Sequence, residues 1–245
     1  MKNSEEVRIP FVETSRETGL TEDEQAVLRE GGRDELREGG QDVRAPGSAG
    51  VPPARIDSRG WHSRGYLPHF DSSELVQSIT FRLVDSLPVS VVQRWQKELA
   101  RLSEKQRDTE IRARVENYLD AGYGECLMRD PEVAIIVENA LLYFDAQRYR
   151  LFAWSIMPNH VHVLAQFLPG HSMSSVLHSW KSFTSKQINL LLGRTGTIWQ
   201  ADYFDRYIRN ETHFQQAKIY IEDNPCKAGL CSVASDWRWS SARRR

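Results

Sequence analysis

Hydrophobic positions recur with two different periods in the part of the chain that follows residue 60. Ile79, Phe81 and Leu83 alternate with polar residues, which is the two-residue period of a strand. After Pro131, apolar residues recur at three- and four-residue spacing, which is the period of a helix that begins at a proline. Along the chain, the two periods predict strands over 76–83, 149–157 and 160–167, an extended segment over 198–209, and helices over 89–102, 111–119, 131–144, 172–192 and 211–223.

The order of these elements predicts the fold class. A strand is followed by helices, two consecutive strands, a helix, an extended segment and a final helix. This succession is typical of an α+β protein of the ferredoxin-like (RRM-like) sandwich type, with one antiparallel sheet. At the last helix, Asn210 or Thr212 is the expected N-cap, and Pro225 is expected just beyond the end.

The first sixty residues differ in composition from the rest of the chain. They contain one aromatic residue, Phe11, of the 24 in the chain, and residues 1–50 carry 7 basic and 12 acidic side chains. Such a segment buries too little apolar surface to offset the entropy of ordering it. We therefore predict a disordered acidic extension and linker over residues 1–58 and a folded domain over residues 59–245.

Composition narrows the function classes. The chain is 40% hydrophobic and 27% charged, and no apolar run approaches the roughly 20 residues that a membrane helix needs. Its start lacks the apolar core of a secretory signal, and three cysteines are too few for a disulfide framework. We expect a reduced, cytoplasmic protein with no membrane partner. The chain contains 11 basic and 6 acidic residues from residue 171 onward, and this excess of positive charge suits a polyanionic partner.

A histidine pair is the main candidate for chemistry. His160 and His162 are two residues apart in a predicted strand, so both imidazoles project from one face, about 6.6 Å apart at the backbone. Two such imidazoles, together with oxygen ligands, suit a divalent metal ion. Leu164 stands where a histidine-triad hydrolase has its third histidine, which excludes that class. Taken alone, the pair is equally compatible with a structural role.

Longer motifs around the pair carry a family resemblance. The segment WSIMPNHVHVL at 154–164 resembles the HUH motif of the single-tyrosine transposases that act on single-stranded DNA. The segments at 64–70, 180–184, 199–209 and 220–230 are similar to blocks of the REP-associated tyrosine transposases, a branch of that family. The resemblance runs in order from about residue 60 to residue 242 and leaves out the acidic extension.

The resemblance implies a DNA transposase and endonuclease with strand-transferase activity, acting on single-stranded or hairpin DNA. Tyr220 matches the nucleophile, which would form a 5′-phosphotyrosine and free a 3′-hydroxyl, while Mg or Mn at His160 and His162 polarises the phosphate. Helical spacing supports this role, since His213, Gln216 and Tyr220 share a face beside the predicted core stripe of Phe214, Ala217 and Ile221. From spacing alone, the alternative is that Tyr220 lies at the edge of the hydrophobic core and has no catalytic role.

The third metal ligand is open between two residues. Asn224 lies one helical turn after Tyr220, but Pro225 disfavours helical geometry at the residue before it, and Asn224 could equally cap the helix. Gln166 lies on the same strand face as His162 and is the substitute.

Basic residues are the candidates for DNA contact, because they can neutralise phosphates. The candidates are Lys181, Arg206, Arg209 and Lys227. The resemblance implies a monomer, although dimers occur in the related insertion-sequence group. The alternative function on the same fold is a hairpin-DNA-binding protein that lacks the chemistry.

Overall fold

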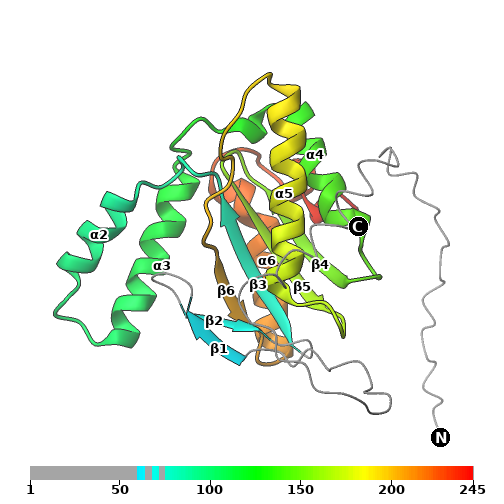
Figure 1. The fold of residues 1–245 in the computed structure, drawn as a ribbon. Helices are drawn as coiled ribbons and strands as arrows, with labels where there is room; N and C mark the ends of the chain where they lie inside the picture. Colours follow the sequence, from blue (N-terminus) through cyan, green and yellow to red (C-terminus); the bar gives the residue numbers. More distant parts are fainter. Residues whose placement is uncertain (1–59, 64–67, 72–74, 245) are drawn as a thin grey trace, which may run out of the picture.

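A four-stranded antiparallel sheet forms the centre of the computed structural model, which describes residues 60–63, 68–71 and 75–244 (Figure 1). The predicted extension over residues 1–58 lies outside these residues. The strands lie in the order β4-β5-β3-β6, which confirms the α+β class with one central antiparallel sheet and gives the ferredoxin-like arrangement. Their bounds are β3 Val76–Arg82, β4 Tyr149–Ile156, β5 His160–Phe167 and β6 Phe204–Tyr207.

Helices cover both faces of this sheet. Helices α4 (Pro131–Tyr143) and α5 (Met173–Leu191) pack on one face, and α6 (Glu211–Lys227) packs on the other (Figure 1). Strand β5 is buried on both sides and divides its residues between two cores: its odd-numbered residues join the α4–α5 core and Leu164 joins the α6 core. His160 and His162 alternate with the odd positions and therefore belong to the α6 face.

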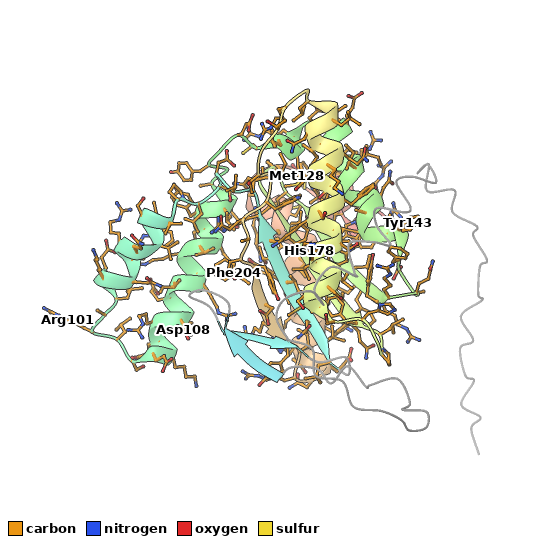
Figure 2. The ribbon with its side chains drawn as sticks, in the orientation of Figure 1. Arg101, Asp108, Met128, Tyr143, His178 and Phe204 are labelled. Atoms are coloured by element: carbon orange, nitrogen blue, oxygen red, sulfur yellow. The ribbon has the colours of Figure 1, made fainter. Side chains whose placement is uncertain are left out.

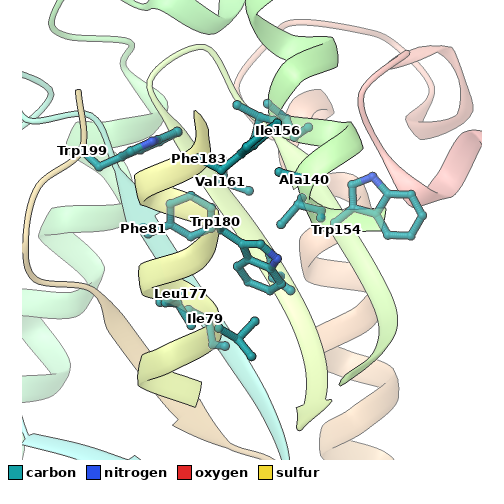
Figure 3. Close-up of a cluster of buried hydrophobic side chains, with 14 of the residues drawn as sticks. Ile79, Phe81, Ala140, Trp154, Ile156, Val161, Leu177, Trp180, Phe183 and Trp199 are labelled. Atoms are coloured by element: carbon teal, nitrogen blue, oxygen red, sulfur yellow. The ribbon is translucent and has the colours of Figure 1, made fainter. Parts of the chain in front are cut away.

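Aromatic packing holds α5 on the sheet. Trp180 and Phe183 are buried against the strands, and the Trp180 ring stacks on Phe81 with ring centroids 6.2 Å apart (Figure 3). The Trp180 Nε1–H donates to the Tyr149 hydroxyl at 3.0 Å, which in turn donates to the Leu141 carbonyl of α4 at 2.9 Å. This chain of hydrogen bonds satisfies the polar atoms of both large side chains inside the core.

A helical hairpin of α2 (Val89–Glu98) and α3 (Glu104–Asp120) stands beside the sheet (Figure 1). The two helices bury a small core of their own, against which Phe204 of β6 packs; Figure 2 shows Phe204 between α3 and β6. Helix α3 begins seven residues before the predicted 111–119, at a capping box formed by Ser103 and Gln106. Its first two turns are largely exposed and lack the apolar period on which the prediction depended.

Helix α6 runs further than predicted. The Asn210 side chain caps it by accepting from the His213 N–H at 2.9 Å, as expected, but the helix continues through Pro225 to Lys227. Proline removes one backbone donor, and the ladder resumes beyond it, where the Ala228 N–H donates to the Asn224 carbonyl at 3.0 Å. The expectation that the helix ends before Pro225 is therefore wrong, and Asn224 is helical.

The remaining elements are short. Strands β1 (Gly60–Ser63) and β2 (Pro68–Asp71) form a separate antiparallel pair, and β2 lies next to β6. Single 3₁₀ turns occur at η2 (Leu127–Arg129), η3 (Ala234–Asp236) and η4 (Ser241–Arg244). Within the described ranges, every helix is too short or too polar to cross a bilayer.

Candidate metal centre and nucleophile

The two histidines of β5 converge as the strand alternation predicts. Both side chains are almost fully buried, their ring centroids are 4.7 Å apart, and His160 Nε2 lies 3.0 Å from His162 Nε2. Two ligands at right angles on metal bonds of about 2.1 Å would be about 3.0 Å apart. The spacing of the two nitrogens therefore fits one shared cation.

Asn159 fixes the tautomer of His160. Its Nδ2 donates to the carbonyls of Leu119 at 3.2 Å and Tyr123 at 2.8 Å, so its Oδ1 must face His160 Nδ1, 2.7 Å away. An amide oxygen only accepts, so Nδ1 carries the proton and Nε2 presents a lone pair. The same amide ties the last turn of α3 to the start of β5.

Thr80 holds the second ring. Thr80 pairs with His162 across the β3–β5 ladder, and its hydroxyl lies 2.8 Å from His162 Nδ1. Burial lowers the pKa of His162 to about 3, and burial with the neighbouring His162 lowers the pKa of His160 well below its usual value. Both imidazoles are therefore neutral at pH 7, which is the form that ligates metals.

A third candidate ligand lies on α3. Asp120 is the last residue of that helix, and its Oδ1 lies 3.7 Å from His160 Nε2. One potential ligand atom from each of Asp120, His160 and His162 lies within 4.8 Å of the other two. Asp120 Oδ1 is buried and has no hydrogen-bond partner among the described residues. Burial and the nearby Glu116 raise the pKa of Asp120 to about 6, against the opposing charge of Lys227. An oxygen without a partner beside two imidazole nitrogens is suited to a divalent cation.

The sequence did not identify Asp120. Five Asp and Glu residues lie in the segment 104–120, and no spacing relative to the histidines singles one out. Only the docking of α3 against the start of β5, through Asn159, brings this carboxylate to the pair.

Tyr220 faces the histidine pair from α6. Its ring centroid lies 5.8 Å from that of His162 in an edge-to-face contact, and Lys227 Nζ lies 4.2 Å above the centre of the Tyr220 ring. Burial raises the pKa of the Tyr220 hydroxyl, and the charges of Glu116 and Asp120 raise it further. The predicted core stripe is also present, with Ile221 buried in the α6 core.

Asn224 lies one turn beyond Tyr220 on the continuous helix. It is completely buried, and neither side-chain polar atom has a hydrogen-bond partner in the described structure. A buried amide without a partner needs an explanation, and a metal ion is one. Gln166 is four residues from His162 along β5, about 13 Å at strand spacing, with Leu164 between them, so the strand places it out of reach of the pair.

The four basic candidates separate into two groups. Lys227 contacts the Tyr220 ring, and Arg209 Cζ lies 5.7 Å from the centre of the Tyr207 ring. The charge of Arg206 lowers the pKa of Glu116. Lys181 instead lies on α5, on the other side of the sheet. Its Nζ donates to the carbonyls of Gln200 and Ala201, and burial lowers its pKa to about 8.

Removing the Asn159 amide should loosen both elements that it joins. We expect Asn159→Ala to lower the free energy of unfolding by about 2 kcal/mol, because two carbonyls and one imidazole N–H lose their partner in the interior. Chemical denaturation would measure the change. Asn117→Ala, on the exposed side of α3, is the matched control and should cost under about 0.5 kcal/mol. Equal values for the two variants would contradict the role given to Asn159.

Comparisons with known proteins find similarity in the part of the chain that contains the two histidines and Tyr220. Residues 136–224 match the family model described as Transposase IS200 like. The matched stretch contains His160, His162, Tyr220 and Asn224, whereas Asp120 and the rest of α3 precede it.

Two curated relatives bear the name of the branch. The REP-associated tyrosine transposase of Escherichia coli (strain K12) is 29% identical over 110 residues, covering 44% of this chain and 64% of the relative. A putative REP-associated tyrosine transposase of Haemophilus influenzae is 26% identical over 106 residues, covering 39% and 60%. The aligned part thus spans less than two thirds of either relative.

A solved structure of a REP-associated tyrosine transposase bound to a REP hairpin also matches, at 19% identity and a TM-score of 0.46, over 74% of this chain and 84% of that one. The sequence comparisons confirm the resemblance carried by the motifs: part of this chain is similar to the REP-associated tyrosine transposases, and its residues 136–224 match the family model described as Transposase IS200 like.

Proposed function

We propose that this protein is a metal-dependent DNA transposase and endonuclease that cuts and rejoins single-stranded or hairpin DNA through a 5′-phosphotyrosine intermediate. The observation that carries the proposal is the convergence of Tyr220 from α6 with the His160–His162 pair of β5, where Tyr220 and His162 are in edge-to-face contact. A hydroxyl nucleophile beside a candidate cation site is the arrangement that phosphoryl transfer to a side chain requires.

The metal would be held by ligands from three elements. His160 and His162 supply Nε2 atoms, Asp120 supplies a carboxylate oxygen, and Asn224 supplies its buried amide oxygen. A hard ion such as Mg²⁺ or Mn²⁺ suits the oxygen ligands. When bound, the ion would neutralise charge on the non-bridging oxygens of the scissile phosphate.

Tyr220 would carry the DNA. Its phenolic oxygen forms a bond to phosphorus, the bond from phosphorus to the 3′-oxygen breaks, and the released strand ends in a 3′-hydroxyl. The ester keeps the energy of the broken bond, so attack by another 3′-hydroxyl rejoins DNA without a nucleotide cofactor. A phenol with a raised pKa is a weak nucleophile in isolation, which is why the site needs charge neutralisation at the phosphate.

Basic residues of α6 and of the end of β6 would hold the DNA backbone. Lys227, Arg206 and Arg209 come from α6 and from the end of β6, and each can neutralise a phosphate. Arg112 of α3, which the sequence did not single out, is near Glu116 and joins this group. Lys181 has its ammonium bonded to two carbonyls on the other side of the sheet, so we propose a structural role for it.

Two labels on one oligonucleotide test the proposal. A hairpin with a single-stranded flank is incubated with the protein and Mn²⁺, then separated under denaturing conditions. A label at the 3′ end should migrate with the protein, and a label at the 5′ end should appear on a shortened strand. A chelator should abolish both products. Tight hairpin binding without either product would instead support the binding protein that lacks chemistry.

Loss of the α3 carboxylate should weaken metal binding. We expect Asp120→Ala to lower the affinity for Mn²⁺ by about 10- to 100-fold, since one charged ligand is lost while both imidazoles remain. Calorimetric titration of the protein with Mn²⁺ would measure it. Glu110→Ala removes an exposed carboxylate from the same helix and should leave the affinity unchanged. An Asp120→Ala protein with wild-type affinity would exclude Asp120 from the ligand set.

A further inference from the structure

Two cysteines meet at the end of α6. Cys226 lies on the last turn of the helix and Cys231 follows it, and their Sγ atoms are 3.3 Å apart. Both are free thiols and both are partly exposed, so an oxidant in solution can reach them. The proposed function uses neither cysteine, and this pair is therefore available for a separate role.

The turn that ends α6 explains why the two thiols meet. The Leu230 N–H donates to the Pro225 carbonyl at 2.9 Å. The Gly229 N–H donates to the Cys226 carbonyl at 3.0 Å, and together these two bonds form a Schellman motif. Gly229 has a φ of 71°, a left-handed conformation that favours glycine. This residue reverses the chain, so Cys231 returns beside Cys226.

The separation of the two sulfurs suits a disulfide. Closing the bond to about 2.05 Å shortens the present 3.3 Å by about 1.3 Å, which small rotations of the two side chains can supply. The third cysteine differs from this pair. Cys126 is only 3% exposed, and its thiol donates to the Gly122 carbonyl at 3.2 Å. Cys126 is therefore an internal control for the reactivity of the pair.

We propose that Cys226 and Cys231 form a reversible oxidation site, at which a peroxide closes an intramolecular disulfide. The first thiol takes one oxygen from the peroxide and becomes a sulfenic acid, while the other peroxide oxygen leaves as water. The second sulfur attacks the sulfenic sulfur and loses its proton, and the sulfenic oxygen leaves as a second water. The two thiols lose two electrons, which reduce the peroxide, and an excess of a small thiol reopens the bond by exchange.

The disulfide would close the end of the helix that carries Tyr220. It joins the turn containing Lys227 to the segment that leads to Trp237, whose Nε1–H donates to the Ile156 carbonyl of β4 at 3.0 Å. A cross-link removes conformations in which this turn is open. The amides of residues 228–230, which donate back to carbonyls of α6, should therefore exchange with solvent more slowly in the oxidised protein.

Peptide mapping tests the bond. Trypsin cleaves after Lys227, between the two cysteines, and places them on separate peptides, 219–227 and 228–238. The full chain is treated with hydrogen peroxide, free thiols are alkylated, and the digest is analysed without reductant. The two peptides should appear as one linked species, with at least a tenfold loss, to about one tenth, of their alkylated forms. Cys126 should stay alkylated, and dithiothreitol should restore both peptides.

The conditions and the control variants follow from the chemistry of the pair. Burial and the contact with Cys226 raise the pKa of Cys231 to about 11, so the reaction is followed for hours at a pH of about 8.5. Cys226→Ser and Cys231→Ser each leave one thiol and should give no linked species. Peptides that stay separate in the oxidised wild-type protein, or that are linked only in a fraction with the mass of two chains, would overturn the proposal.

Hydrogen exchange tests the effect on the helix end. Exchange of the amides of residues 228–230, followed by NMR, should slow by about 5- to 10-fold on oxidation of the wild-type protein and stay unchanged in Cys231→Ser treated in the same way. Unchanged exchange in protein that contains the bond would refute the closure of the turn. Neither measurement uses DNA or a metal ion, so these results and those for the proposed function can fail independently.

Discussion

Replacing Tyr220 by phenylalanine is expected to abolish covalent linkage to DNA, with a fall of at least about a thousand-fold in the rate of adduct formation. The change removes one oxygen atom and leaves the ring that packs against His162 and under Lys227. Fold, metal affinity and hairpin affinity should therefore stay near wild type. Quantified denaturing gels with 3′-labelled hairpin would measure the rate.

A second tyrosine provides the matched control for this prediction. Tyr143 lies on α4, on the other face of the sheet from α6. Tyr143→Phe should therefore form the adduct within about threefold of the wild-type rate. Adduct formation that persists in Tyr220→Phe would show that another residue is the nucleophile.

Loss of either histidine should have the second largest effect. We expect His160→Ala and His162→Ala each to reduce metal-dependent cleavage by about 100- to 1,000-fold, because the remaining ligands no longer fix the cation beside the phosphate. Binding of Mn²⁺ should fall in parallel. Hairpin affinity should change little, since the basic residues of α6 and of the end of β6 remain. Cleavage rates with varied Mn²⁺ and gel-shift affinities would measure the two properties.

His178 supplies the comparison for these variants. It is an exposed residue of α5, on the opposite side of the sheet (Figure 2), and His178→Ala should leave both cleavage and metal binding unchanged. A normal cutting rate in His160→Ala or His162→Ala, with Mn²⁺ still required, would remove the pair from the metal site.

The strands and helices whose buried residues recur at a regular period could be predicted from the sequence. Strand β5 has the predicted bounds, and the alternation along it placed both imidazoles on one face, where the structure brings their Nε2 atoms to 3.0 Å. The i, i+7 spacing of His213 and Tyr220 placed the tyrosine beside the core stripe of α6. Periodicity is sufficient for these features because burial on one face dictates it.

Other features depend on contacts between distant segments and could not be predicted. The first half of α3 is polar and exposed, so its length had no hydrophobic signal, and the position of Asp120 depends on hydrogen bonds from Asn159. The preference of residues before proline for extended geometry argued against a helical Asn224. Burial of that turn of α6 between the sheet and the C-terminal segment outweighs the local preference.

The central claim is that Tyr220 carries the DNA strand while His160 and His162 hold the metal. The most direct test is to trap the covalent complex with a short hairpin in Mn²⁺, digest protein and DNA, and locate the modified residue by mass spectrometry. We predict a nucleotide joined through its 5′-phosphate to Tyr220, absent when Mn²⁺ is chelated and absent in His162→Ala. A nucleotide on any other residue, or cleaved DNA with no modified peptide, would contradict the claim.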